Sequence, residues 1–115
     1  MSRTWIYPVR KDATGRPTVI ELHDGDTFKL LLDGGIDTGM FPWLRVAGID
    51  SPALNTPEGK AAAAFTAEVL ANASDIEVGV HGRSFNRWVG KVVVDGRDLA
   101  EVLIEAGHGV PYAKG

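Results

Sequence analysis

The pattern of hydrophobic and polar positions predicts five β-strands, each a short run rich in β-branched and aromatic residues and bounded by turn residues. The first three are separated by short glycine-containing turns, which predicts an antiparallel meander. The five predicted strands cover residues 18–23, 26–32, 40–47, 76–80 and 88–94. A strand-like run at residues 5–9, followed by a polar turn, predicts an N-terminal strand or hairpin extension over residues 1–17.

Two α-helices are predicted from apolar residues that recur every three or four positions. The first begins at Thr56, a capping hydroxyl, with Pro57 at its first helical position. The second begins at Asp98, with Glu101 placed to complete a capping box, and ends at Gly107. The predicted inner stripes are Ala62, Phe65, Val69 and Ala73 in the first helix, and Leu99, Val102, Leu103 and Ala106 in the second.

Three strands, a helix, two strands and a short helix, in this order, predict a mainly β protein with helices, in the α+β class. The OB-fold, a five-stranded barrel, is the natural closed arrangement for this order. We therefore expect residues 18–115 to form one OB-fold domain with two helices, the first of which plugs the barrel. The length of 115 residues fits a single domain with a modest core.

Composition narrows the class of protein. Hydrophobic residues make up 44% and charged residues 23% of the chain, which is typical of a soluble globular protein. No apolar run is long enough for a signal sequence or a membrane span, so we expect a soluble protein, cytoplasmic by default. The absence of cysteine excludes disulfides and thiolate metal sites. A net charge of −3 argues against a strongly basic nucleic-acid clamp, so nucleic-acid binding would depend on local chemistry.

Candidate chemistry is concentrated in residues 44–52. Arg45 has apolar neighbours on both sides, and a guanidinium on a partly buried strand needs an anionic partner. Asp50 follows the bend at Gly48 and is placed to hold a cation or to cap a loop. A cationic group beside an anionic one suggests a metal-assisted phosphate site. The alternative is a structural ion pair between Arg45 and either Asp50 or Asp26.

Three blocks of residues resemble the staphylococcal nuclease, or thermonuclease, family. They are Asp24-Gly25-Asp26-Thr27, then Arg45-x-x-Gly48-Ile49-Asp50-Ser51-Pro52, then Asn86-Arg87-Trp88-Val89-Gly90 ahead of Asp95-Gly96, and the resemblance covers residues 19–112. It implies an OB-type barrel with helices and calcium-dependent hydrolysis of phosphodiester bonds in DNA and RNA. The expected partner is a single-stranded or flexible nucleic acid, and the expected state is a monomer.

The resemblance also implies roles for individual residues. Asp26 and Asp50 match two carboxylates that ligate Ca²⁺, and the backbone carbonyl of Ser51 matches a third ligand. Arg45 and Arg87 match the two arginines that grip the scissile phosphate. These residue types suit the task, because Ca²⁺ prefers hard oxygen ligands and guanidinium groups donate two hydrogen bonds to phosphate oxygens.

The sequence departs from the family at the general base. The family has a glutamate where this chain has Ala53, and an alanine cannot accept a proton. We consider an engineered inactivating substitution, replacement of the base by Glu58, or a naturally non-catalytic domain that binds nucleic acid or protein. Phe85 stands where the family often has a tyrosine, and Asn86 replaces a glycine. Phe85 and Tyr112 are the expected substrate contacts.

Other conspicuous side chains have a structural interpretation. His23, His81 and His108 share no metal-ligand spacing, and we expect no catalytic role for them. Trp43 and Trp88 are expected to be core or barrel-rim residues.

Overall fold

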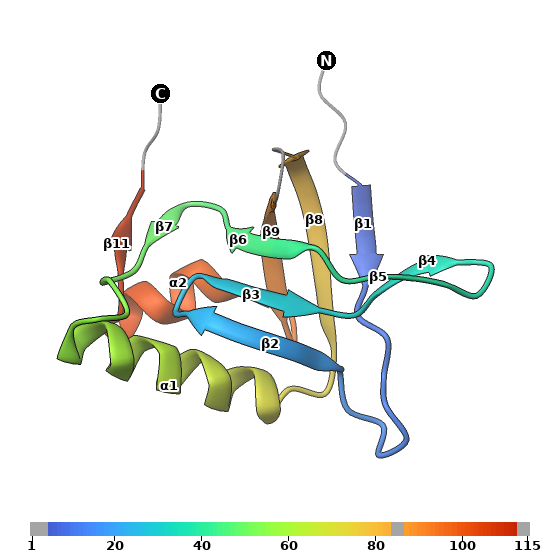
Figure 1. Ribbon diagram of the computed structural model, residues 1–115, viewed down its shortest axis with the longest axis horizontal. Helices are drawn as coiled ribbons and strands as arrows, with labels where there is room; N and C mark the ends of the chain where they lie inside the picture. Colours follow the sequence, from blue (N-terminus) through green and yellow to red (C-terminus); the bar gives the residue numbers. More distant parts are fainter. Residues whose placement is uncertain (1–4, 84–86, 113–115) are drawn as a thin grey trace.

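The computed structural model describes residues 5–83 and 87–112, which form a mixed α+β fold of mostly strands with two helices, α1 (Pro57–Ala71) and α2 (Leu99–Glu105) (Figure 1). In these residues no helix has both the length and the apolar character needed to cross a membrane. The strands are β1 (Trp5–Pro8), β2 (Val19–Asp24), β3 (Thr27–Leu30), β4 (Leu32–Gly35), β5 (Thr38–Met40), β6 (Trp43–Val46), β7 (Ile49–Asp50), β8 (Ile76–Arg83), β9 (Trp88–Val94), β10 (Arg97–Asp98) and β11 (Val110–Pro111).

The main sheet has the strand order β1-β8-β9-β6-β3-β2, with β10 paired to β9. Its pairs are antiparallel except for β6 and β9, which run parallel because α1 and β8 lie between them in the chain. Two small ribbons complete the structure: the hairpin β4-β5 projects from the body, and β11 pairs with β7 (Figure 1). The meander expected from the sequence is therefore β2-β3-β6, with the hairpin inserted before its third strand.

The hydrogen-bonded ladder is an open path from β1 to β2 rather than a closed ring. The β8 side of the sheet and the strand after β3 nevertheless approach each other at Val9, just after β1. The N–H of Val9 donates to the carbonyl of Ile76 at 2.9 Å, and Val9 also forms an isolated bridge with Leu32. The segment expected to be an extension thus supplies the edge strand of the main sheet.

The hydrophobic core lies between the inner face of the sheet and the two helices. On β6, Leu44 and Val46 are fully buried, whereas Trp43 and Arg45 alternate with them on the outer face and are only half-buried. The helices contribute Leu70 from α1, and Leu99 and Leu103 from α2. The residues with no exposed surface include Phe28, Leu30, Leu32, Val78 and Val92.

The predicted starts of both helices are confirmed. Thr56 caps α1 and accepts from the N–H of Gly59 at 2.9 Å, with Pro57 as the first helical residue. Asp98 caps α2, but its carboxylate accepts from the N–H of Ala100, at 3.0 Å. In the described residues no bond from Glu101 completes the predicted capping box.

The buried face of α1 differs in part from the predicted stripe. Ala62 is buried as expected, whereas Phe65 and Val69 are only partly buried. Ala73, predicted as the last residue of the stripe, is buried but lies beyond the end of α1. Four residues outside the predicted stripe complete the buried face, namely Gly59, Ala63, Thr66 and Leu70. The face is rotated because small residues let the helix lie close to the turn that follows β2, as described below.

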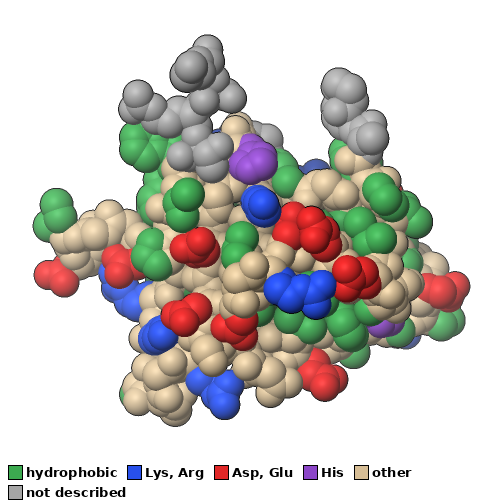
Figure 2. Space-filling model, turned by 180° about the vertical axis from the view of Figure 1, so that it is seen from behind, with side chains coloured by type: hydrophobic (Ala, Val, Ile, Leu, Met, Phe, Trp, Pro, Cys, Tyr) green, Lys and Arg blue, Asp and Glu red, His purple; other side chains and the backbone are tan. Residues whose placement is uncertain are grey.

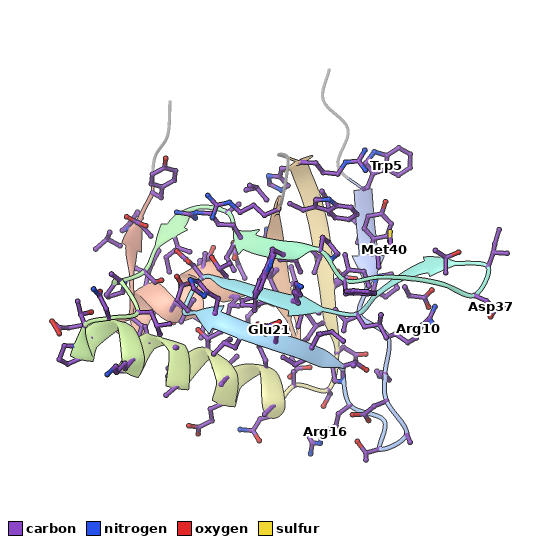
Figure 3. The ribbon with its side chains drawn as sticks, in the orientation of Figure 1. Trp5, Arg10, Arg16, Glu21, Asp37 and Met40 are labelled. Atoms are coloured by element: carbon purple, nitrogen blue, oxygen red, sulfur yellow. The ribbon has the colours of Figure 1, made fainter. Side chains whose placement is uncertain are left out.

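Two predicted turns have a different form. The first tight turn is centred on Gly25 and Asp26, one residue later than predicted, because Asp24 pairs with Thr27. The turn expected over residues 33–39 is instead the β4-β5 hairpin. Its tip places Ile36 and Asp37 at φ of 50° and 59°, and Figure 3 labels Asp37 at the far end of the projection.

Candidate functional site

Asp26 is the buried centre of the candidate site. It lies in the turn between β2 and β3 and is only 5% exposed. Its Oδ1 accepts from the hydroxyl of Thr27 at 3.0 Å, and its Oδ2 accepts from the backbone N–H of Ser51 at 3.1 Å. Buried carboxylates are stable only when they are paired in this way. The turn after β2 is thereby joined to the turn after β7.

Helix α1 holds this turn from the other side. The hydroxyl of Thr66, fully buried, donates to the carbonyl of Gly25 at 2.8 Å. A Cβ at Gly25 would lie 3.0 Å from the Cβ of Ala62 and 3.3 Å from that of Ser51, so a glycine is needed for this close approach. Sequence analysis did not identify Thr66; its only signal was a polar residue beside the predicted apolar stripe.

Arg45 connects the two carboxylates expected to ligate a metal. Its Nη1 lies 3.8 Å from Oδ2 of Asp26, and its Nη2 lies 3.4 Å from Oδ1 of Asp50. Nη1 also donates to the carbonyl of Ile49 at 3.1 Å. The Arg45 side chain is 19% exposed and that of Asp50 is 59% exposed, so the cluster opens to solvent on the Asp50 side.

The ribbon formed by β7 and β11 covers one side of Arg45. Val110 pairs with Asp50, and the N–H of Tyr112 donates to the carbonyl of Gly48 at 3.0 Å. The guanidinium of Arg45 lies 5.2 Å from the centre of the Tyr112 ring, a cation–π distance. Tyr112 was expected to contact substrate; here its ring lies against Arg45, the residue expected to bind phosphate.

Asp24 and Asp26 share one environment but have opposite pKa shifts. Burial raises the pKa of Asp24 above its ordinary value, and the carboxylate of Asp26 raises it further. Burial also disfavours the charged form of Asp26, but hydrogen bonds from Asp24, Ser51 and Thr27, with the charge of Arg45, hold its pKa below the ordinary value. As the pH falls, Asp24 therefore takes up a proton before Asp26 does.

The oxygen donors of this cluster are of the kind that Ca²⁺ prefers. They are the carboxylates of Asp26 and Asp50 and the backbone carbonyl of Ser51, which was the expected third ligand. The hydroxyl of Ser51 is a further oxygen, buried with no hydrogen-bond partner among the residues that the structure describes. Over residues 5–83 and 87–112, no three His, Asp or Glu side chains form a ready-made metal cluster. Arg45 lies against both carboxylates, so a bound cation would have to share them with it or displace it.

Ala53 lies in the segment between Ser51 and α1, and Glu58 lies in the first turn of α1. The Ala53 carbonyl accepts from the hydroxyl of Thr56 at 2.6 Å, and a Cβ at Gly59 would lie 1.8 Å from that carbonyl oxygen. Both Ala53 and Glu58 are exposed. Among the described residues no hydrogen bond or ion pair joins Glu58 to Asp26, Arg45 or Asp50.

Arg87 precedes β9 and lines a hollow of about 430 Å³ together with His23, Thr27 and Trp43. Thr27 is paired directly with Arg45 across β3 and β6, so Arg45 and the hollow belong to the same outer face of the sheet. Arg45 itself does not line the hollow. Phe85 and Asn86, two further positions from the sequence analysis, lie outside the described residues.

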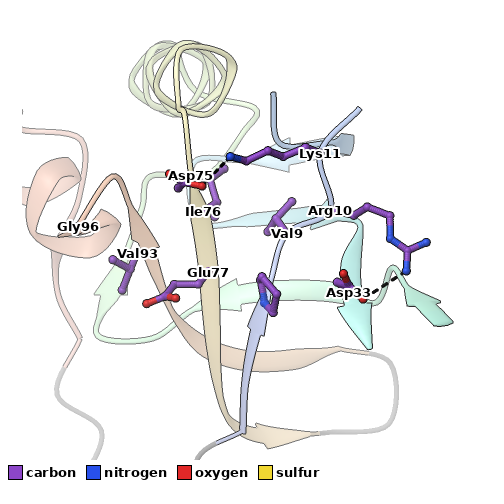
Figure 4. A pocket seen from close by; sticks show the side chains of 10 residues that line it. Val9, Arg10, Lys11, Asp33, Asp75, Ile76, Glu77, Val93 and Gly96 are labelled. Carbon is purple, nitrogen blue, oxygen red and sulfur yellow. Dashed lines mark hydrogen bonds and ion pairs between the residues drawn. The ribbon is translucent and has the colours of Figure 1, made fainter. Parts of the chain in front are cut away.

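A second hollow of about 430 Å³ lies along β1 and the start of β8 (Figure 4). Its charged side chains include two ion pairs, Lys11 with Asp75 at 2.8 Å and Arg10 with Asp33 at 3.3 Å. These pairs tie the residues after β1 to the start of β8 and to β4. Figure 2, seen from behind, shows acidic and basic side chains interspersed on that face. The net charge of −3 therefore does not form a single acidic patch there.

No protein-family model matches the chain, and no curated protein was found to match it.

Proposed function

We propose that this chain is a thermonuclease-like domain, related to the staphylococcal nuclease family, which binds phosphodiesters of DNA or RNA with Ca²⁺ and cleaves them weakly or not at all because Ala53 replaces the general base. One observation carries the proposal. Asp26, Arg45 and Asp50 come from separate segments and meet in one cluster, with Asp26 buried and Asp50 open to solvent. Burial of a carboxylate is costly even when an arginine beside it offsets part of the cost, which favours a functional reason for the burial of Asp26.

Each residue has a role in this proposal. Asp26 and Asp50, with an oxygen of Ser51, would hold Ca²⁺, which when bound polarises the phosphate and lowers the pKa of an attacking water. Arg45 and Arg87 bind the phosphate oxygens, where fixed guanidinium charges stabilise the charge that develops in the transition state. Thr66 and the N–H of Ser51 keep Asp26 in place.

We also propose that the sheet is the five-stranded OB-fold barrel expected from the sequence, formed by β2, β3, β6, β9 and β8. The order of these five strands in the main sheet supports this assignment. The contacts of Val9 with Ile76 and Leu32 support it too, because they link the β8 side of the sheet to the strand after β3. In this arrangement β1 is an added strand that helps to close the barrel.

A non-catalytic module that binds nucleic acid or protein is the second candidate. The ion pairs of Arg45 favour it, because a guanidinium engaged with both Asp26 and Asp50 is also what a purely structural cluster would show. The missing base at Ala53 favours it as well.

The experiment that separates the two restores the missing base. Cleavage of single-stranded DNA with Ca²⁺, and with chelator instead, is measured for the original chain, for Ala53→Glu and for Ala53→Gln. Ala53 is exposed, so either longer side chain can be accommodated. We expect Ala53→Glu to raise the Ca²⁺-dependent rate by about a hundredfold to ten-thousandfold, the usual contribution of a general base, and Ala53→Gln to leave it unchanged.

Glu58 is tested in the same assay. If it serves as the base, the original chain is active with Ca²⁺ and Glu58→Gln abolishes the activity, whereas Glu68→Gln, an exposed glutamate further along α1, does not. If Ala53→Glu stays inert while Ca²⁺ and nucleotide still bind, the nuclease proposal is wrong and the binding module is retained.

A further inference from the structure

We propose that the hollow lined by His23, Thr27, Trp43 and Arg87 is a nucleobase subsite, in which an unpaired base stacks on the indole of Trp43. The inference rests on the proposed function, since it places the base next to the phosphate site. It also changes the role of Trp43, which the sequence suggested to be a core or rim residue. The hollow of about 430 Å³ is within the usual range for small-ligand sites.

The indole of Trp43 is held in position by its neighbours. The ring of His23 meets it at 73° with a centroid distance of 6.1 Å, an edge-to-face arrangement. The ammonium of Lys29 lies 4.6 Å from the ring centre, yet Lys29 does not line the hollow. An aromatic surface held on two sides and facing a hollow is a prepared stacking platform, because little side-chain freedom remains to be lost on binding.

The hollow lies beside the phosphate-binding arginine. Trp43 and Arg45 are alternate residues of β6 on its outer face, so their Cα atoms are about 7 Å apart. Thr27 lines the hollow, pairs with Arg45 in the sheet and donates its hydroxyl to Asp26. A nucleotide whose phosphate is bound by Arg45 and Arg87 can therefore place a neighbouring base on Trp43.

The charges around the hollow suit a single strand. Arg87, which lines the hollow, and Lys29, which lies against Trp43, supply positive charge. One acidic residue is near them: Glu21, which Figure 3 labels on β2, lies directly opposite Lys29 in the sheet. Stacking on a side chain needs the open face of a base, which a paired and stacked duplex does not offer. The subsite thus favours unpaired DNA or RNA over a duplex.

The test compares two probes, a thymidine tetranucleotide and an abasic tetranucleotide with the same phosphates. Binding with Ca²⁺ is measured by calorimetry for the original chain, for Trp43→Ala, for Trp43→Phe and for Phe41→Ala. Phe41 is the matched control, an aromatic residue two positions away that is 58% exposed and does not line the hollow. Circular dichroism checks that each variant is folded, and an RNA tetranucleotide and a hairpin duplex extend the comparison.

We expect Trp43→Ala to weaken binding of the thymidine probe by about 5-fold to 150-fold, the range that stacking of one base supplies. Trp43→Phe, which keeps an aromatic face, and Phe41→Ala should bind it as the original chain does, and the abasic probe should be insensitive to all three changes. If both probes bind equally and Trp43→Ala changes neither, the subsite is wrong while the phosphate site stands. If neither probe binds the original chain, the proposed function fails and the subsite with it.

If Trp43→Ala fails to fold, quenching of tryptophan fluorescence tests the subsite instead. Tryptophan fluorescence of the original chain should fall on adding the thymidine probe, and Trp43→Phe should lose that quenching while retaining affinity. Quenching that persists in Trp43→Phe would overturn the subsite.

Discussion

The backbone N–H of Ser51 donates a hydrogen bond to Oδ2 of Asp26, at 3.1 Å, across 25 positions of sequence. The same two segments supply the residues proposed to hold Ca²⁺. Their relative position is therefore fixed by the folded chain before any cation binds, apart from the exposed side chain of Asp50. Arg45 lies against both carboxylates, so a bound cation would either share them with it or displace it.

The first prediction concerns Ca²⁺ itself. We expect Ca²⁺ at millimolar concentration to raise the unfolding temperature and chelator to reverse the rise, because a ligand that binds only the folded state stabilises it by mass action. Differential scanning calorimetry of the original chain and of Asp26→Asn with Asp50→Asn measures the effect. A stabilisation that survives in the double variant would show that the ion binds elsewhere.

Replacing Arg45 should change the affinity for Ca²⁺ and the affinity for a nucleotide in opposite directions. Because its guanidinium lies against both carboxylates, Arg45→Gln should tighten Ca²⁺ binding by roughly fivefold, the factor that corresponds to about 1 kcal/mol between charges 4 Å apart in solvent. The same change should weaken binding of a nucleoside bisphosphate. Calorimetric titration with each ligand tests this prediction. The control is Arg97→Gln, which removes an ion pair between Arg97 on β10 and Glu105 on α2. Equal weakening of both ligands would mean that Arg45 acts as a scaffold for the cluster.

Thr66 should matter far more than an exposed threonine. Thr66→Val leaves the carbonyl of Gly25 buried without its donor, and we expect a loss of about 1–3 kcal/mol in the free energy of unfolding. Thr38→Val is the matched control, since Thr38 is exposed and its hydroxyl bond is 3.4 Å long. Urea denaturation measures both. Because the turn at Gly25 carries Asp26, we also expect Thr66→Val to weaken the binding of Ca²⁺.

The pKa shifts predict opposite pH effects for two aspartates. The folded pKa of Asp24 is raised, so its stabilising contribution is present below the ordinary aspartate pKa and is lost as the pH rises through the folded value. Asp24→Asn should therefore stabilise the protein at neutral pH. The folded pKa of Asp33 is lowered by bonds from Gly35 and Arg10, so its contribution is present above the ordinary value and is lost in acid. Asp33→Asn should destabilise at neutral pH.

Both differences should vanish in strong acid, where each carboxyl is protonated in the folded and unfolded states. Unfolding temperatures measured from pH 7 down to pH 2 without Ca²⁺ test the pair. A stabilisation by Asp24→Asn that is independent of pH would assign the effect to packing and not to charge.

The helices were predictable because their signals are local. The side chains of Thr56 and Asp98 accept from N–H groups within three residues, and Pro57 suits the first helical position because its φ is fixed, so the helix starts can be inferred without knowledge of the rest of the fold. The β4-β5 hairpin was missed because its two-residue tip places Ile36 at positive φ, where glycine or asparagine is the usual signal. Asp33 is a local signal for the turn, because its carboxylate accepts a hydrogen bond from the N–H of Gly35.

The site was predictable by residue type and less so by geometry. Asp26, Arg45 and Asp50 were identified from their sequence blocks, and the structure brings them together. The alternative of an ion pair was also identified, yet sequence could not indicate that Arg45 contacts both carboxylates. Thr66 and the ribbon of β7 with β11 depend on contacts between distant segments, and nothing near them in the chain signals those contacts.

The close approach of Gly59 to the Ala53 carbonyl has a consequence for how this chain can change. The backbone at position 53 is fixed by α1, since the carbonyl oxygen occupies the space where any side chain at position 59 would begin. Residue 53, in contrast, is exposed. Mutation at this one position can therefore exchange a proton acceptor for a methyl group, or restore it, at almost no cost in folding. Under the proposed function, a nuclease and a binding protein would be one substitution apart on an unchanged scaffold.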